Sequence, residues 1–491
     1  MKRTLIFIWA PFLMSNTLDA RNCFPSVDDD LSISGDCDVI SVDCANGNSK
    51  TSTFISPRPI TADLTYRNCT TFFNRFHGDA SCYFFTYDST FIVQQTRKNV
   101  NIGRGFFGQN PLLVAQFGAP FNSTNLGLVS SQPEGFFSTI RLSPRRKVFA
   151  WMPQFIFNLE GLCDCLWADI VFAVVQAKHQ INIFEQIITV ADDEDRTTVK
   201  KALDQLQIFP ESQSHTGVDD VEMRVGYTVQ YCEDDMFGFY AFGSIPTRRK
   251  FDNSRWFQPL VGSKSVSIGA GLIFDSTLWY SEFVEAECLL LTELKYRYQF
   301  SYSDRRIFDL NNGPLSRFLL VAPQDNPNKS QSGTTLFRGC VTIEPCSSVD
   351  WWIALHYKYC CWGLEIGYNL WFLEHGHIRP TTFDFESFGI FDMTRTINRT
   401  SHSTAVISDG PGEELPDPTF VKLTSSDINF HSAERQSALS HTFSGALTYS
   451  TSWCDLPLSF SLGARYEAAG EKRHTSTLES WGILYKFSAS F

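Results

Sequence analysis

Two short clusters carry side chains that could bind a metal ion. Glu374-His375-Gly376-His377 places a carboxylate and two imidazoles within four residues, and Cys163-x-Cys165 places two thiols one residue apart. Imidazole, thiolate and carboxylate are ligands that proteins offer to zinc, but a closed zinc site takes two ligand pairs at spacings of about two to four residues. We interpret the histidine cluster as a hydrated loop at a strand end and predict no metal and no cofactor.

Enzyme motifs are not found in the sequence. It has no Gly-rich phosphate loop and no Gly-x-Ser-x-Gly nucleophile elbow. The segment 375–437 is acidic, which a hydrated surface explains without catalysis; its carboxylates include Asp392, Asp409, Glu413, Glu414 and Asp417. Because no nucleophile or acid pair is singled out, we predict that the protein is not an enzyme.

Composition narrows the classes further. The 491 residues include 41 Lys and Arg against 53 Asp and Glu, a net charge of −12. Aromatic residues reach 14% and charged residues only 19%, which excludes a disordered chain. Nucleic-acid binding needs clustered basic residues, so an acidic chain of this kind argues against it. Fourteen cysteines favour an oxidising compartment.

The first 20 residues are typical of a secretory signal peptide. Lys2 and Arg3 precede the apolar run Thr4–Met14, and a small residue, Ala20, ends the segment. A transmembrane anchor is the alternative, but a spanning helix needs roughly 20 apolar residues. We therefore predict export, with 1–20 as the signal peptide.

Strict two-residue alternation predicts long β-strands. In 479–491 the apolar series ends at a terminal Phe491, and Lys486 lies on the opposite face. The same alternation occurs in 361–374 and 284–303. These runs have about 10–16 residues, longer than the mode of about 5–6 in soluble proteins and sufficient for tilted transmembrane strands.

We predict an all-β fold, a transmembrane antiparallel β-barrel of about 14 strands that occupies residues 133–491. The predicted strands are 133–143, 146–160, 166–178, 221–232, 236–245, 265–280, 284–303, 315–323, 335–344, 349–359, 361–374, 438–453, 455–467 and 479–491.

Counting strands back from the C-terminus assigns the connections to two sides. The periplasmic side receives 161–165, 233–235, 281–283, 324–334, 360 and 454. The outer side receives the long loops 179–220, 246–264 and 375–437, together with 304–314. Short turns on one side and long loops on the other are typical of outer-membrane barrels.

The polar strand faces supply the candidate pore-lining residues, which carry both signs of charge. These are Glu222, Arg224, Glu293, Lys295, Arg297, Lys358, Glu365 and Arg465. Mixed charges could filter solutes in an open lumen, or could pair across a narrow interior and close it.

The cysteines are predicted to form disulfides, with the pairing left open. The candidates are Cys23, Cys37, Cys44, Cys69, Cys82, Cys163, Cys165, Cys232, Cys288, Cys340, Cys346, Cys360, Cys361 and Cys454. Most of them fall at the predicted periplasmic turns or in 21–132. That segment has five cysteines and turn residues, and we expect a periplasmic or plug segment there; a tail without fixed structure is the alternative.

The alternating strands that end in Phe491 resemble bacterial outer-membrane β-barrels, whose terminal aromatic residue is an assembly signal. An N-terminal segment before about fourteen strands is similar in layout to the long-chain fatty-acid transporters. Three blocks, 54–63, 243–262 and 308–320, resemble an uncharacterised outer-membrane protein family of Dependentiae-type intracellular bacteria. The cysteine content is similar to that of the chlamydial major outer-membrane porin. These resemblances imply a barrel in the bacterial outer membrane, with lipid and the barrel-assembly machinery as partners.

Three functions fit this sequence. The first is passive passage of small solutes through a polar lumen. The second is a disulfide-linked structural or adhesion protein of the envelope, and the third is a lipid transporter, which needs an apolar cavity. Self-association into a homo-oligomer stays open.

Overall fold

A computed structural model describes most of residues 84–491. The remaining residues lie outside the description: 1–83 and, among the gaps further along, 97–111, 249–258, 392–419 and 470–478. The predicted signal peptide and most of the predicted plug segment fall outside the described residues.

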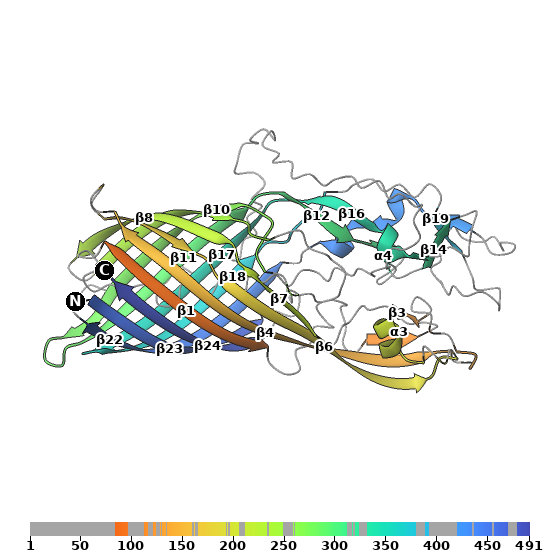
Figure 1. The fold of residues 1–491 in the computed structure, drawn as a ribbon, viewed down its shortest axis with the longest axis horizontal. Coiled ribbons are helices and arrows are strands. Elements are labelled where there is room, and N and C mark those ends of the chain that lie inside the picture. The colour runs from red at the N-terminus through yellow and green to blue at the C-terminus, as the bar shows by residue number, and fades with distance from the viewer. Residues whose placement is uncertain are drawn as a thin grey trace, which may run out of the picture. The chain divides into compact units, whose positions relative to one another are not determined.

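Twelve strands of the described chain form a closed antiparallel barrel, drawn as oblique arrows in Figure 1. Strand β1 pairs with β24 on one side and with β4 on the other, which closes the sheet. The barrel strands are β1 (Phe85–Thr96), β4 (Phe137–Asn158), β5 (Leu166–Val171), β8 (Val221–Cys232), β9 (Asp235–Ile245), β10 (Ser267–Ser281), β11 (Ala286–Gln299), β17 (Cys346–Tyr359), β18 (Trp362–Leu373), β22 (Ala438–Trp453), β23 (Leu456–Ala469) and β24 (Ser480–Ser490).

The predicted count of 14 strands is wrong, for three reasons. The segments 133–143 and 146–160 form one strand, β4, which runs through Ser143-Pro144 without a turn. The described strands within 315–323 and 335–344 are Leu320–Pro323 and Arg338–Ile343, and they belong to small sheets outside the barrel. The strand β1, in contrast, comes from 21–132, where no barrel strand was predicted. Of the 14 predicted strands, two lie outside the barrel and two merge into one, while β1 is added. The barrel therefore has 12 strands, which is still an even number.

Four strands extend the barrel sheet beyond the closed ring. After a break at 172–173, β6 (Val174–Thr189) continues the path of β5 and pairs with both β4 and β7 (Gln213–Val218). The short β2 (Leu112–Ala115) and β3 (Phe121–Asn122) pair with each other, and β2 also pairs with β4. A short helix, α3 (Val199–Gln205), lies between β6 and β7 in the chain.

The connections that leave β11 and β18 fold around an apolar cluster of their own. Its members include Phe308, Phe337, Ile343, Ile378 and Ile428, all at most 5% exposed. The elements concerned are β12 (Tyr302–Ile307), β13 (Asp309–Leu310), β14 (Leu320–Pro323), β15 (Gln331–Ser332), α4 (Gly333–Leu336), β16 (Arg338–Ile343), β19 (Phe388–Phe391), β20 (Phe420–Lys422), η6 (Ser425–Asp427), β21 (Ile428–Asn429) and η7 (Phe430–Ala433). We call them the outer elements.

Ion pairs accompany this cluster. The Asp304 carboxylate lies 2.6 Å from Lys264 Nζ and 3.0 Å from an Arg306 nitrogen. Burial opposes ionisation, but the cations Arg306, Lys264 and Arg248 outweigh it and lower the pKa of Asp304 below its usual value. Asp309 pairs likewise with Arg317 through two hydrogen bonds. The outer elements are therefore a folded unit with a core and paired charges.

The barrel has short turns at one end and long connections at the other. Consecutive strands β17 and β18 are joined by the two-residue turn Cys360-Cys361, in which Cys360 has φ 51°. A two-residue hairpin favours such a positive φ because its twist matches that of the strands. The predicted turn 324–334, in contrast, belongs to the long connection between β11 and β17.

The described cysteines do not form disulfides. The described cysteines are Cys165, Cys288, Cys340, Cys346, Cys360 and Cys361, and each carries a thiol that is not part of a disulfide within the chain. The sulfur atoms of Cys360 and Cys361 are 3.6 Å apart, against about 2.05 Å in a disulfide. Disulfides within the chain are therefore not formed by these six, because the fold distributes them among turns and strand ends without pairing them. The side chains of the other eight candidates lie outside the description.

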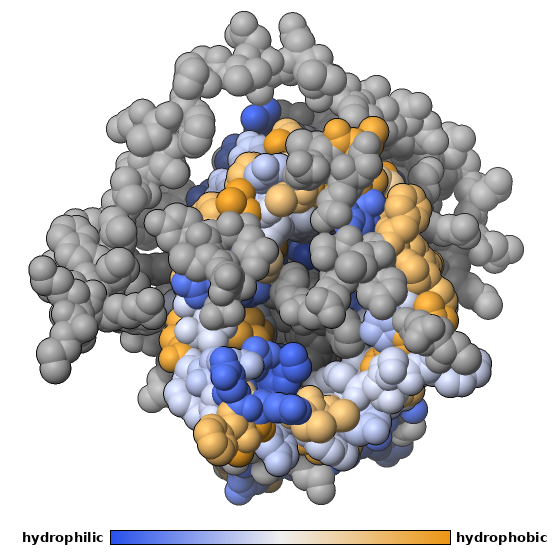
Figure 2. Space-filling model, turned by 90° about the vertical axis from the view of Figure 1, so that its left-hand side faces the viewer, coloured by the Kyte–Doolittle hydropathy of each residue, from blue (hydrophilic) through white to orange (hydrophobic). Residues whose placement is uncertain are grey.

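The two faces of the barrel wall differ in polarity. In β18, Leu364 and Ile366 are 48% and 64% exposed, whereas Glu365 between them is 3% exposed. The same alternation follows β24, where Ile483 and Tyr485 are exposed and Leu484 and Lys486 are buried. Figure 2 shows apolar side chains on the outer flanks of the molecule. Within the described chain, helices are too short or too polar to cross a bilayer.

Candidate functional site on the inner wall of the barrel

Six ionisable side chains from three strands gather on one part of the inner wall. We call them the charged wall: Asp169 of β5, Glu222 and Arg224 of β8, and Glu293, Lys295 and Arg297 of β11. Residues two apart in a strand share a face, so each strand presents its charges to the lumen. The three carboxylates and three cations sum to zero net charge.

Five of the six charges of this wall are in ion pairs. Arg224 donates two hydrogen bonds to the Asp169 carboxylate, one of them from Nε at 2.8 Å, and Gln154 Nε2 donates a third at 2.8 Å. Glu222 lies between two cations, 2.5 Å from Lys295 Nζ and 2.6 Å from Arg297 Nη2. Buried charges are tolerated only with such partners, and Glu222 is 0% exposed.

Aromatic side chains of β9 lie between the charged strands. The Tyr240 hydroxyl donates a hydrogen bond to Glu293, and its ring lies 5.6 Å from the Arg224 guanidinium. The Phe242 ring lies 4.4 Å from Lys295 Nζ. Cation–π contacts of this kind stabilise a cation whose hydration has been removed. The aromatic rings therefore help to hold the cations in place.

Glycines make room for these rings. Trp167 of β5 lies across Gly226 so closely that a Cβ on the glycine would come within 2.2 Å of the indole. The Tyr240 ring covers Gly271 in the same way. Trp167 Nε1 also donates to Thr228 Oγ1 at 2.9 Å. The rings of Trp167 and Tyr240 therefore pack directly onto glycines of the neighbouring strands. These contacts hold the side chains of the charged wall in position.

A second polar group lies on β1, β23 and β24. Lys486 Nζ lies 2.7 Å from the Asp88 carboxylate, with side chains only 4% exposed. Arg465 donates to Gln94 Oε1 at 2.7 Å, and Gln94 in turn contacts Glu467. Strand β1 pairs with the C-terminal strand β24 where the barrel closes. These side-chain pairs therefore also stabilise barrel closure.

Apolar side chains occupy the inner wall between these polar groups. We call them the apolar wall, which consists of Ile92, Val148, Ala150, Met152 and Leu484 of the barrel strands together with Val175 of the adjoining β6. Ile92 is the register partner of both Leu484 and Ala150, and Ala150 is the partner of Val175. Because these residues are neighbours across four strands, they form a continuous band, each member at most 2% exposed.

All eight sequence-predicted pore-lining residues lie on inward-facing positions, but in different settings. Glu222, Arg224, Glu293, Lys295 and Arg297 belong to the charged wall. Glu365 lies 3.7 Å from His356, and Arg465 belongs to the second polar group. Lys358 is half exposed near the end of the barrel that has the short turns, and its Nζ lies 3.0 Å from Glu287 Oε1. Their part in a pore stays a prediction.

The sequence interpretation missed several members of these groups. Asp169 has the inward parity of its strand but lies in a short apolar run, where its partner Arg224 is 55 residues away. Asp88 and Gln94 were missed because β1 was not recognised as a barrel strand. The alternation in 85–96, with Thr86, Asp88 and Thr90 on one face, was the signal that could have found them.

The architecture defines the class of this protein. A closed antiparallel barrel with lipid-type side chains outside and paired ionisable side chains inside is a transmembrane barrel of the bacterial outer membrane. The terminal Phe491 pairs through its backbone with Phe85 of the first strand, donating to Phe85 O at 2.8 Å. The chain is therefore a bacterial outer-membrane β-barrel protein.

Comparison with known proteins finds solved structures that are similar to this chain but no family that it matches. No family model and no curated protein matches the sequence. Among solved structures, the chain is similar to an outer-membrane channel from Pseudomonas putida F1, with a TM-score of 0.38, 9% identity, and 83% of this chain and 96% of that chain covered.

Two further solved structures are similar at the same level. The translocator domain of the autotransporter NalP from Neisseria meningitidis has a TM-score of 0.32 and 6% identity, with 90% of this chain and 100% of that chain covered. A FadL homologue from Pseudomonas aeruginosa has a TM-score of 0.29 and 8% identity, with 83% and 90% covered.

Proposed function

We propose that the protein is a narrow outer-membrane channel for small solutes, in which the charged wall filters what passes. The observation that carries this proposal is the set of six inward-facing ionisable residues with zero net charge. Ionisable residues inside a membrane protein are costly and mark ion or substrate pathways. A purely structural barrel would be served as well by uncharged inner side chains.

The burial of this wall supports a narrow passage. Glu222, Glu293 and Lys295 are each at most 5% exposed, so little water contacts them. Barrels of about 8 strands are filled by their side chains, and those of about 16–18 leave an aqueous channel. Twelve strands lie between these limits. Passage then requires the paired side chains to move aside for a small solute.

Conductance of the folded protein in planar bilayers tests the proposal. We expect small current steps, because the lumen is narrow, and larger steps after Asp169→Asn with Arg224→Met, which removes one pair that blocks the lumen. Folding is checked by heat-modifiable migration on gels. Folded protein that stays silent in both forms would exclude the channel.

The apolar wall favours a second candidate, passage of apolar solutes. The band formed by Ile92, Leu484 and Met152 gives such a solute a dry surface inside the barrel. Uptake of a hydrophobic fluorophore into proteoliposomes distinguishes the passage of apolar solutes from an ion-filtering channel. Transport of apolar solutes predicts uptake that Leu484→Asn abolishes, whereas an ion-filtering channel predicts conductance that this variant leaves unchanged.

Other features of the sequence extend the proposal. We propose that residues 1–20 direct export and that Phe491, which is 53% exposed, is read by the assembly machinery.

A disulfide-linked envelope scaffold predicts ladders on non-reducing gels that collapse with thiol. The free thiols of Cys165, Cys360 and Cys361 are exposed, so bonds between molecules are the form that such linkage would take.

A further inference from the structure

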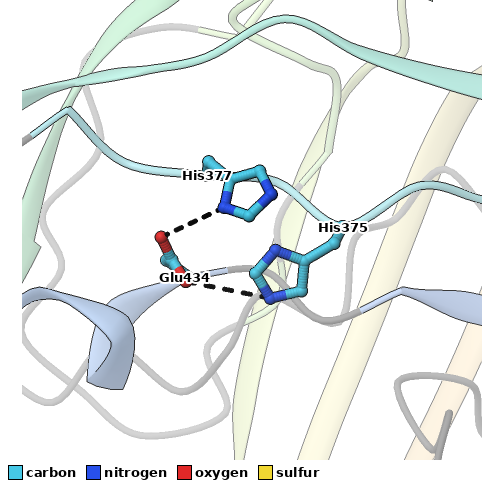
Figure 3. A group of neighbouring side chains, drawn as sticks. All are labelled: His375, His377 and Glu434. Carbon is cyan, nitrogen blue, oxygen red and sulfur yellow. Dashed lines mark ion pairs between the residues drawn. The ribbon is translucent and has the colours of Figure 1, made fainter. Parts of the chain in front are cut away.

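Three side chains that are far apart in the sequence meet among the outer elements. His375 and His377 follow the end of β18, and Glu434 directly follows η7, in the short segment that leads to β22. Figure 3 shows the two imidazoles turned toward the Glu434 carboxylate. The apolar cluster brings them together, because Ile378 and Ala433, next to these residues, are both buried in it.

The distances between these side chains come close to those of a metal-ligand set. His377 Nδ1 lies 3.5 Å from one Glu434 oxygen, and His375 Nε2 lies 3.8 Å from the other. The two rings have centroids 4.6 Å apart, and one ligand atom from each residue fits within 4.8 Å of the others. Zinc bonds of about 2.0–2.2 Å at a tetrahedral centre place ligand atoms roughly 3.3–3.6 Å apart. Small rotations of the rings would therefore suffice.

The Glu434 carboxylate is held in place from a second direction. The Ile378 backbone N–H donates to one of its oxygens at 3.2 Å. His431 Nδ1 lies 2.8 Å from the other oxygen, and the His431 ring is largely exposed. The carboxylate is 5% exposed, whereas His375 and His377 are 29% and 48% exposed. The cluster thus has a fixed inner ligand and outer ligands that an incoming ion can reach.

We propose that His375, His377 and Glu434 form a binding site for a divalent transition-metal ion of the zinc class. Two imidazoles and one carboxylate match the ligands of zinc sites, whereas Ca²⁺ and Mg²⁺ prefer sets of oxygen ligands. The ion joins the two ends of the connection between β18 and β22.

Cobalt binding to the full-length protein in detergent tests the site. Thiols are first blocked with N-ethylmaleimide, so that cysteines do not bind the probe. We expect one equivalent of Co²⁺ to bind with a visible absorption band typical of nitrogen and oxygen ligands, and Zn²⁺ to displace it. His375→Ala with His377→Ala should weaken binding at least tenfold.

The matched control is His215→Ala, which removes an exposed histidine of β7 outside the cluster. This variant should bind Co²⁺ as the unaltered chain does. Equal binding by the double variant and the control would overturn the proposal. So would the lack of any stoichiometric binding by the folded, unaltered protein, a result that does not depend on whether a variant folds. Either result leaves the proposed channel function untouched.

Discussion

The charged wall and the apolar wall are both buried inside the same barrel, yet they are stabilised by different interactions. The charged wall depends on specific partners, as Glu222 does on Lys295 and Arg297. The apolar wall depends on contact area, and Ile92 and Leu484 are both 0% exposed. A buried charge that loses its partner leaves a large uncompensated cost, whereas a buried methyl group that is lost leaves only a small cavity. The comparison teaches that the loss of one partner should disturb the charged wall far more than the loss of one methyl group disturbs the apolar wall.

The largest expected effect is that of breaking one pair on the charged wall. Arg224→Met leaves the Asp169 carboxylate without its cation, and we expect a loss of about 3–5 kcal/mol in the free energy of unfolding. The measurement is urea unfolding in liposomes, followed by tryptophan fluorescence. The double variant Asp169→Asn with Arg224→Met removes both charges and should recover most of the loss. Equal losses in single and double variants would contradict the pairing.

The next effect concerns the rings that support the charged wall. Gly226→Ala places a methyl group within 2.2 Å of Trp167, so the indole must shift. We expect a loss of about 1–3 kcal/mol. Gly243→Ala is the matched control, since nothing lies within 4 Å of its new methyl group. If both variants unfold at the same urea concentration, the contact between Trp167 and Gly226 is unimportant.

A smaller effect is expected on the apolar wall. Ile92→Val removes one buried methylene, and we expect a loss of about 0.5–1.5 kcal/mol. Because no charge changes, the ion selectivity of the channel should stay as it is. A change in selectivity without a change in charge would show that the two walls are not independent.

The smallest effect is expected at the turn end. Lys358 and Glu287 form an ion pair that is 49% and 26% exposed, respectively. Exposed pairs contribute about 0–1 kcal/mol, so Lys358→Ala should scarcely change unfolding in urea. A loss comparable with that of Arg224→Met would mean that burial is not what separates these two pairs.

The sequence predicted the class of fold because alternation records which face of a strand meets lipid. In β18 the predicted outward series, with Leu364 and Ile366, is the one that the structure exposes. Alternation does not show where one strand ends and another begins, which is why 133–143 and 146–160 were separated at Pro144. Proline is found mainly in edge strands and at strand ends, so Pro144 suggests a boundary between two strands. In the structure, β4 continues through Pro144.

The candidate site was predicted only in part. Strand parity identified Glu222 and Lys295 as inward-facing, because the pattern is local. Their pairing is not local, since they are 73 residues apart and meet only because β8, β9, β10 and β11 lie side by side. The histidine cluster shows the same limit. His375 and His377 stood out in the sequence, but Glu434 meets them only through the packing of Ile378 and Ala433.

The ion selectivity of the reconstituted barrel tests most directly whether the charged wall filters what passes. The measurement is the reversal potential in a KCl gradient, for the unaltered protein and for Glu222→Gln. The unaltered wall has no net charge, so its reversal potential should lie close to zero. Removal of one carboxylate leaves Lys295 and Arg297 in excess and should shift the potential toward that of an anion-selective channel. An unchanged potential in a folded, conducting Glu222→Gln variant would contradict the proposal.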